Sequence, residues 1–314
     1  MEKGEQQLGT AVVLIVFNRP TLTRAVFDRI AQARPKQLLV IADGPRPDRE
    51  GESALCAEVR RIATEVHWEC ELLLNFAEEN MGCRQRVISG LDWAFEQVEE
   101  AIILEDDILP DPSFFLFCEQ MLERYRGDPR VAMITGFNIA ADQLQVPHSY
   151  YFSELTHIWG WATWRDAWRH YDPQMISWPA VRDAGMLREI FTEPSALRYW
   201  TPILEGMYQG HGPNTWDYQW MYTNLTRRCV SIVPQVNLVR NLGFGLDATH
   251  VTDAGGAPKV SVKTLQFPLQ HPPAMIVSRS MDRLDQRISD WHVPSLPKRV
   301  FRKLRRMVTA RKRA

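Results

Sequence analysis

Long apolar runs, dinucleotide-binding glycine motifs and zinc-type cysteine pairs are all missing from this sequence of 314 residues. The lack of any run of 18 apolar residues excludes an ordinary transmembrane helix. No G-x-G-x-x-G follows the first apolar run, which argues against a dinucleotide oxidoreductase, and neither a P-loop lysine pattern nor a G-x-S-x-G elbow is present. The five cysteines are odd in number and scattered, and the first ten residues lack the order of a signal peptide. We therefore expect a cytoplasmic protein with reduced thiols.

The charge is distributed unevenly along the chain. Residues 298–314 hold 9 of the 37 Lys and Arg residues and no acid, so the remainder carries 28 basic against 38 acidic residues. An acidic body argues against nucleic acid as the main partner. The segment from Lys298 to Ala314 has an apolar stripe among its basic residues. It predicts either an amphipathic helix that binds an anionic membrane surface at the inner face of the cell membrane, or a disordered basic tail.

Apolar runs alternate with helical patterns through the first 135 residues. The predicted strands cover residues 11–17, 37–42, 70–75, 101–104 and 131–135. The predicted helices cover residues 21–33, 53–66 and 80–98, and a fourth begins at Pro112 with Asp111 as its N-cap. Strands that alternate with helices predict an α/β fold with a largely parallel, doubly wound sheet.

Three carboxylates, Glu105, Asp106 and Asp107, directly follow the buried strand at residues 101–104. Open α/β sheets bind their ligands at the carboxyl ends of the strands. Adjacent negative charges raise one another's pKa unless a cation neutralises them, and a hard divalent cation held by carboxylate oxygens and substrate phosphate would do so. The alternative is an acidic strand end that faces solvent. Polar breaks after two further strands add Arg19 and Asp43, so we expect these groups to converge in one cleft.

The second half of the chain is rich in aromatic residues, with eight of the eleven tryptophans between residues 159 and 220. Helical spacing relates Trp161, Trp164, Trp168 and Tyr171, which predicts an aromatic core stripe. The bend at Gly160 indicates that its two neighbours, Trp159 and Trp161, also border a pocket.

The segment W-D-Y-Q-W at residues 216–220 sets its two tryptophans on one helical face and turns Asp217 about 100° away. In that apolar setting the carboxylate is a candidate base with a raised pKa; the alternative is a helix cap or a solvent-facing residue. Residues 231–241 predict a strand broken by Pro234. The glycine-rich segment from Gly243 to His250 predicts a closing lid or a surface hairpin.

This combination suits transfer of a sugar from a nucleotide-activated donor. The metal would stabilise the diphosphate leaving group, and a base would deprotonate the acceptor hydroxyl on the opposite face of the sugar, with inversion. The chain then divides into a nucleotide-sugar-binding half at residues 1–142, an acceptor-side half at 143–260, and a C-terminal extension at 261–314.

Five stretches resemble the N-acetylglucosaminyltransferase I family, in the same order along the chain. They are VLIVFNR at residues 13–19, LLVIADG at 38–44, IILEDDILPDPSFF at 102–115, the tryptophan-rich stretch at 159–168, and WDYQWM at 216–221. The resemblance spans residues 11–250 and implies a GT-A (Rossmann-like) nucleotide-diphospho-sugar transferase fold and an inverting, Mn²⁺- or Mg²⁺-dependent transfer from a UDP-sugar. Because the family's membrane anchor is absent, the chain looks like a bacterial cytosolic relative that acts on a glycan, lipid-linked glycan or glycoprotein.

The resemblance also implies roles for individual residues. Asp107 would bind the metal and Asp217 would be the base. Donor contacts would come from Arg19, from Asp43 at the uracil edge, and from Glu105, Asp106, Gly160, Trp161, Trp216 and His250. Arg84 would stand about where the family uses a histidine against the nucleotide.

Two other functions fit part of this pattern. A sugar-nucleotide nucleotidyltransferase also uses an α/β nucleotide domain, but it carries a glycine-rich, basic loop after its first strand, where this chain has Asn18-Arg19-Pro20. A catalytically silent scaffold of a glycan assembly complex would not need an intact E-D-D and Asp217.

Overall fold

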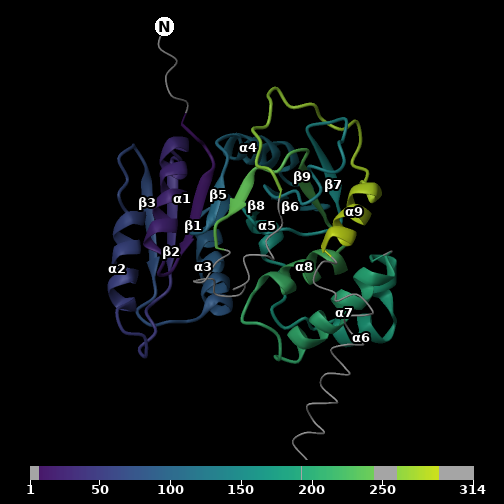
Figure 1. The fold of residues 1–314 in the computed structure, drawn as a ribbon, viewed down its shortest axis with the longest axis horizontal. Coiled ribbons are helices and arrows are strands. Elements are labelled where there is room, and N and C mark those ends of the chain that lie inside the picture. Colours follow the sequence, from purple (N-terminus) through teal and green to yellow (C-terminus); the bar gives the residue numbers. More distant parts are fainter. Residues whose placement is uncertain (1–6, 192, 244–259, 290–314) are drawn as a thin grey trace, which may run out of the picture.

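The computed structural model describes residues 7–191, 193–243 and 260–289 and is an α/β protein organised around one eight-stranded sheet (Figure 1). The strand order is β3-β2-β1-β4-β8-β6-β9-β7. The strands are β1 (Ala11–Val16), β2 (Gln37–Ala42), β3 (Glu71–Phe76), β4 (Glu100–Glu105), β6 (Val131–Thr135), β7 (Tyr150–Ser153), β8 (Trp161–Trp164) and β9 (Val230–Pro234). A second sheet pairs β5 (Ile108–Pro110) with β10 (Val239–Asn241).

The strands β3, β2, β1 and β4 run parallel, and so do β6 and β9. The strands β8 and β7 run antiparallel to their neighbours. The central strand β1 is an unbroken apolar run that is buried on both faces, as parallel strands covered by helices require. Its register sets Leu14 opposite Val40 of β2 and Leu104 of β4. The predicted mixed α/β fold with a largely parallel sheet is therefore confirmed.

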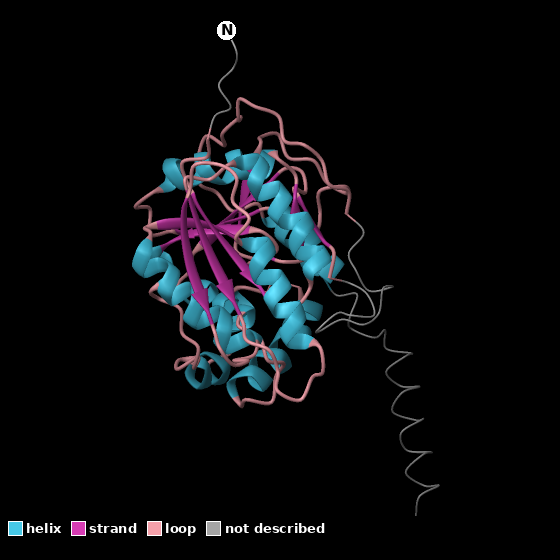
Figure 2. Ribbon diagram, turned by 90° about the vertical axis from the view of Figure 1, so that its left-hand side faces the viewer, coloured by secondary structure: helices cyan, strands magenta, loops and turns pink. Residues whose placement is uncertain are grey.

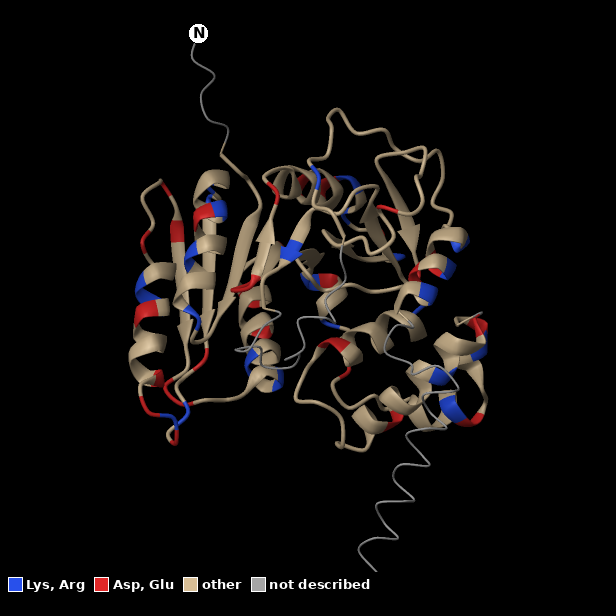
Figure 3. Ribbon diagram, in the orientation of Figure 1, with Lys and Arg blue, Asp and Glu red and all other residues tan. Residues whose placement is uncertain are grey.

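Helices cover both faces of the sheet (Figure 2). On one face α1, α2 and α4 pack on Val12, Leu14 and Val16, and on the other α3, α5 and α8 pack on the alternate residues of β1. The helices are α1 (Pro20–Ala33), α2 (Glu52–Ala63), α3 (Cys83–Gln97), α4 (Ser113–Tyr125), α5 (Arg165–Trp168), α6 (Trp178–Asp183), α7 (Pro194–Tyr208), α8 (Asp217–Thr226) and α9 (Arg279–Ser289), with a 3₁₀ helix η1 (Met186–Glu189). Figure 3 shows Lys and Arg interspersed with Asp and Glu along the outer helices.

The tryptophan-rich stretch differs from its predicted helical form. Trp161 and Trp164 belong to the strand β8, and only residues from Arg165 onward are helical. The reason is tertiary, because β8 fills the gap between β4 and β6 and bonds to both. Trp168 and Tyr171 nevertheless stack at 4.6 Å between ring centroids, so the predicted aromatic core is present.

The two predicted halves of the chain share the main sheet, since β8 of the second half lies between β4 and β6 of the first.

The fourth helix begins one residue later than predicted, at Ser113 instead of Pro112. The backbone N–H of Ser113 donates to Asp111 Oδ1 at 2.9 Å. Within the described ranges no helix has both the length and the apolar character needed to cross a membrane. The predicted basic tail at residues 298–314 lies outside the described residues.

Candidate functional site

The three adjacent carboxylates lie where β4 leaves the sheet. Glu105 is the last residue of β4 and pairs with Ile15 of β1, and Asp106 is buried with 2% of its surface exposed. The guanidinium of Arg19, at the carboxyl end of β1, forms ion pairs with Asp106 and with Asp107, the latter at 2.9 Å from Nη1 to Oδ2. The predicted convergence of Arg19 with this cluster is therefore present in the structure.

One guanidinium does not balance three carboxylates. Burial raises the pKa of Glu105 above its ordinary value, and the negative charges of Asp107, Asp106 and Asp217 raise it further. Burial also raises the pKa of Asp106, against the opposing effect of Arg19. The cluster therefore holds protons, or would hold another cation, at a pH where free carboxyl groups are ionised.

Replacing Glu105 by Gln is expected to weaken the dependence of stability on pH. A carboxyl group whose pKa is higher in the folded chain stabilises the fold below its unfolded-state pKa, and this contribution is lost as the pH rises through the folded-state pKa. The wild type should thus lose stability relative to E105Q on going from pH 5 upward, with a slope of up to about 1.4 kcal/mol per pH unit. Chemical denaturation at several pH values without divalent cations measures this, and parallel curves for the two proteins would contradict it.

Asp107 is held at the cavity by the small sheet. Leu242 donates its backbone N–H to the Asp107 carbonyl at 2.7 Å, next to the β5–β10 pair. Gly243 then approaches so closely that a Cβ there would lie 2.1 Å from Asp107 Oδ2 and 3.1 Å from Asn241 Oδ1. A side chain at residue 243 would therefore collide with the carboxylate, and the Gly243 backbone N–H donates to Asn241 Oδ1 at 2.7 Å.

This oxygen set bears on the metal that the family resemblance implies. Among the described residues, no group of three or more His, Cys, Asp and Glu side chains is placed to hold a metal ion. Mg²⁺ and similar hard ions are commonly bound through one or two protein carboxylates plus substrate phosphates and water. Asp107, with Asn241 near the same glycine and excess negative charge around it, would suit an ion of that kind, whose remaining ligands would come from a diphosphate.

Asp217 is the first residue of α8, and it lies on the same cavity as the carboxylate cluster. The hydroxyl of Thr215 donates to its Oδ1. Trp216 is buried behind it and stacks on Trp161 with ring centroids 5.4 Å apart. Asp217 is thus half-buried at a helix start, where the backbone dipole favours a negative charge, next to the buried Trp216.

The cavity that these residues share has a volume of about 720 Å³. Arg19, Asp43, Glu105, Asp106, Asp107, Trp216 and Asp217, all predicted from the sequence, line it. Trp159, on the other side of the Gly160 bend, lines it as well.

Three predicted donor contacts lie elsewhere. Arg84 donates to the carbonyl of Pro173 at 2.5 Å. Gly160, with a positive φ of 59°, packs on Val239, and Trp161 is 1% exposed in the core. None of these three is among the residues that line the cavity, within the part of the chain that the structure describes. The predicted lid, including His250, falls in residues 244–259, outside the described residues.

Several lining residues were not predicted, namely Phe17, Arg46, Asn80, Cys83, Asn214, Thr215 and Asn241. Asn214 and Thr215 directly precede the W-D-x-x-W segment, so their closeness to this motif in the sequence could have marked them as lining residues. Asn241 is the last residue of β10. Asn80 lies in the β3–α3 connection and Cys83 begins α3. Because this connection follows the carboxyl end of another parallel strand, β3, its residues could have been expected at the same edge of the sheet.

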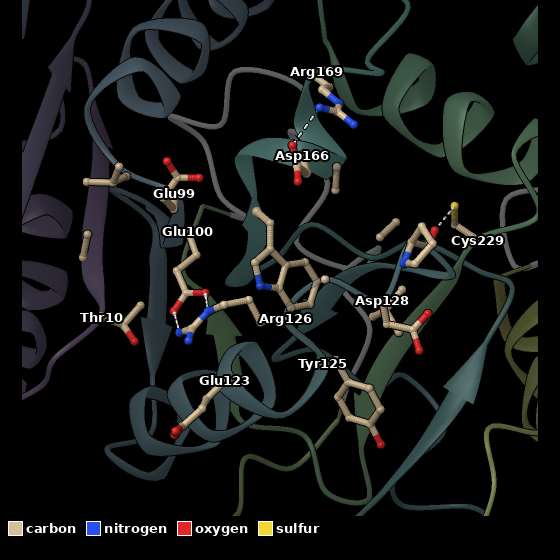
Figure 4. A pocket seen from close by; sticks show the side chains of 18 of the residues that line it. Thr10, Glu99, Glu100, Glu123, Tyr125, Arg126, Asp128, Asp166, Arg169 and Cys229 are labelled. Carbon is tan, nitrogen blue, oxygen red and sulfur yellow. Dashed lines mark hydrogen bonds and ion pairs between the residues drawn. The ribbon is translucent and has the colours of Figure 1, made fainter.

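A larger cavity of about 790 Å³ lies at the opposite edge of the sheet (Figure 4). Thr10, Glu100, Val131 and Cys229 place it at the amino ends of β1, β4, β6 and β9. Figure 4 shows Arg126 turned toward Glu100, with an ion pair of 2.8 Å. Because most of its carboxylates already have arginine or backbone partners, we place the functional site at the carboxyl ends, where negative charge is in excess.

Comparisons with known proteins do not assign the chain to a family. No protein-family model matches it, and no curated protein matches it. Among solved structures, it is similar to UDP-glucose pyrophosphorylase complexed with UDP-glucose, with 8% sequence identity and a TM-score of 0.31, over 52% of this chain and 78% of that chain. A likeness of this degree identifies neither an activity nor a ligand, so the functional assignment rests on the site itself.

Proposed function

We propose that the protein is a metal-dependent, inverting glycosyltransferase of the GT-A type. It would transfer a hexose such as N-acetylglucosamine from a UDP-sugar to a hydroxyl group of a glycan or a related acceptor. The observation that carries the proposal is that Asp107 and Asp217, from two distant parts of the chain, line one cavity at the carboxyl ends of parallel strands. Such an edge is where open α/β sheets bind their ligands.

On the donor side, Asp107 would hold Mn²⁺ or Mg²⁺ together with the donor diphosphate, and such an ion would supply positive charge to stabilise the leaving UDP. Arg19 lies beside the same carboxylate, at 2.9 Å from Nη1 to Asp107 Oδ2, and its guanidinium would contact the donor phosphates. Glu105 and Asp106 complete the negative field that attracts the cation. These roles explain why so many carboxylates share one buried strand end.

On the acceptor side, Asp217 takes the proton from the attacking hydroxyl group. Its carboxylate is oriented by the Thr215 hydroxyl, which donates to Oδ1. A base that delivers the nucleophile to the face opposite the leaving group gives inversion at the anomeric carbon, by the logic that governs inverting glycosidases. In the reaction, the hydroxyl proton passes to Asp217, and the bond between the acceptor oxygen and the sugar forms as the bond between the sugar and UDP breaks.

Calorimetric titration with UDP, GDP and CDP, each with and without Mn²⁺, tests the proposal. We expect binding of UDP that requires Mn²⁺, and at least about tenfold weaker binding of GDP and CDP, a difference of about 1.4 kcal/mol. Failure of all three nucleotides to bind would exclude a nucleotide-sugar enzyme and favour a catalytically silent scaffold.

A further inference from the structure

The carboxylate of Asp43 is fully engaged inside the protein. Its Oδ1 accepts hydrogen bonds from the backbone N–H groups of Gly44 at 2.9 Å and Met81 at 2.8 Å. Its Oδ2 accepts from Asn80 Nδ2 at 3.0 Å and from the Gly82 N–H at 3.1 Å. An ionised carboxylate has about four acceptor sites. Asp43 is also only 6% exposed, so it has no acceptor capacity left for a ligand.

The segment that Asp43 holds, residues 80–83, forms part of the cavity wall. It leads from the β3–α3 connection into the first residue of α3, Cys83, and the backbone N–H of Arg86 in α3 donates to the Gly82 carbonyl at 2.9 Å. Gly82 has a φ of 77°, and a Cβ there would lie 2.7 Å from Asn214 Nδ2. The segment is therefore in close contact with Asn214, which lies three residues before Asp217.

Cys83 shows how closely this segment approaches the reacting groups. Burial raises the pKa of its thiol to about 12, and the negative charges of Glu105, Asp217 and Asp43 raise it as well. Cys83 thus lies among the carboxylates of the donor side and that of the candidate base. A shift of residues 80–83 would therefore change the surroundings of the carboxylates on both the donor side and the acceptor side of the cavity.

We infer that Asp43 is a positioning residue: it fixes residues 80–83 against residues 213–217 and thereby sets where Asp217 faces the donor sugar. The inference rests on the proposed function for the role of Asp217, and it differs from the nucleobase contact that the family resemblance implies. Turning the Asp43 carboxylate toward a nucleobase would leave the backbone N–H groups of Met81 and Gly82 without their acceptors, which is costly inside a protein. Held as it is, Asp43 serves the transfer step through its neighbours.

Asp43→Asn in the full chain tests this by hydrogen exchange. The amide keeps the shape but puts an NH₂ group where two donors need an acceptor. We expect amide exchange to quicken at least tenfold in residues 80–83 and at least threefold in residues 213–217, with no change at the opposite edge of the sheet. Unchanged exchange in residues 213–217 would overturn the inference, whatever the activity of the protein.

Kinetics of the same variant separate positioning from nucleobase recognition. With UDP-N-acetylglucosamine as the probe, the rate of UDP release at saturating donor should fall at least tenfold, because a small misplacement of a catalytic group is costly, while the Kd for UDP stays within threefold. A tenfold rise in that Kd with an unchanged saturated rate would overturn the inference.

A second variant keeps the test decisive if Asp43→Asn does not fold. Asn80→Ala removes the bonds from Asn80 Nδ2 to Asp43 Oδ2 and to the Gly44 carbonyl at 2.9 Å, and leaves the carboxylate in place. The same pattern of exchange is expected, and its absence from residues 213–217 would again count against the inference. A wild type that binds no nucleotide would instead contradict the proposed function and leave the exchange result to decide the role of Asp43.

Discussion

Replacing Asp107 by Asn is expected to abolish the Mn²⁺-dependent binding of UDP. The substitution keeps the size of the side chain and its place beside Gly243 but removes the negative charge that would hold the ion. Because the ion is expected to contribute several kcal/mol to the interaction with the diphosphate, the Kd for UDP should rise about 100-fold or more. Titration of UDP into the variant at saturating Mn²⁺ measures the effect.

A matched control separates a local effect from a general change of charge. Asp166→Asn makes the same substitution at the other edge of the sheet, where Asp166 is 75% exposed and pairs with Arg169 at 2.8 Å. We expect this variant to bind UDP like the wild type. If Asp107→Asn kept Mn²⁺-dependent UDP binding within a factor of three of the wild type, another group would hold the ion, and the assignment of Asp107 would be wrong.

The part of the site that could be predicted from the sequence follows from one geometric rule. Unbroken apolar runs mark parallel strands that are buried on both faces, and a polar residue after such a run must lie at the carboxyl edge of the sheet. That rule brought Arg19, Asp43 and the cluster at Asp106 together, and β1, β2 and β4 are indeed neighbours in the sheet. The acidic cluster was informative because its position relative to the strand end was fixed.

What could not be predicted depends on contacts between distant segments. Trp161 and Trp164 have helical spacing, yet they form a strand because β4 and β6 present backbone groups to them. Arg84 lies one residue beyond the segment at 80–83 and bonds to Pro173 instead of facing the cavity. The saturation of Asp43 by four donors is likewise a property of the folded chain, since three of them come from residues 80–82.

Asp217→Asn is expected to remove sugar transfer while leaving donor binding intact. Asn can still accept the Thr215 hydroxyl through its Oδ1, so the start of α8 should keep its structure. The amide cannot take a proton from the acceptor, and loss of a general base lowers the rate by about 10²- to 10⁴-fold. UDP titration should give a Kd within twofold of the wild type, and transfer from UDP-N-acetylglucosamine to an acceptor glycan found by screening should fall by that factor.

A comparison of the two substitutions tests whether donor binding depends on Asp107 and proton removal on Asp217. Asp107→Asn should act on binding, whereas Asp217→Asn should act on turnover, and Asp183→Asn, 68% exposed beside Arg182, should affect neither. Near-normal transfer by the Asp217 variant would show that the acceptor loses its proton elsewhere. Loss of UDP binding by that variant would show instead that residues 213–217 form part of the donor site, because a residue that acts only as a base makes no contribution before the acceptor arrives.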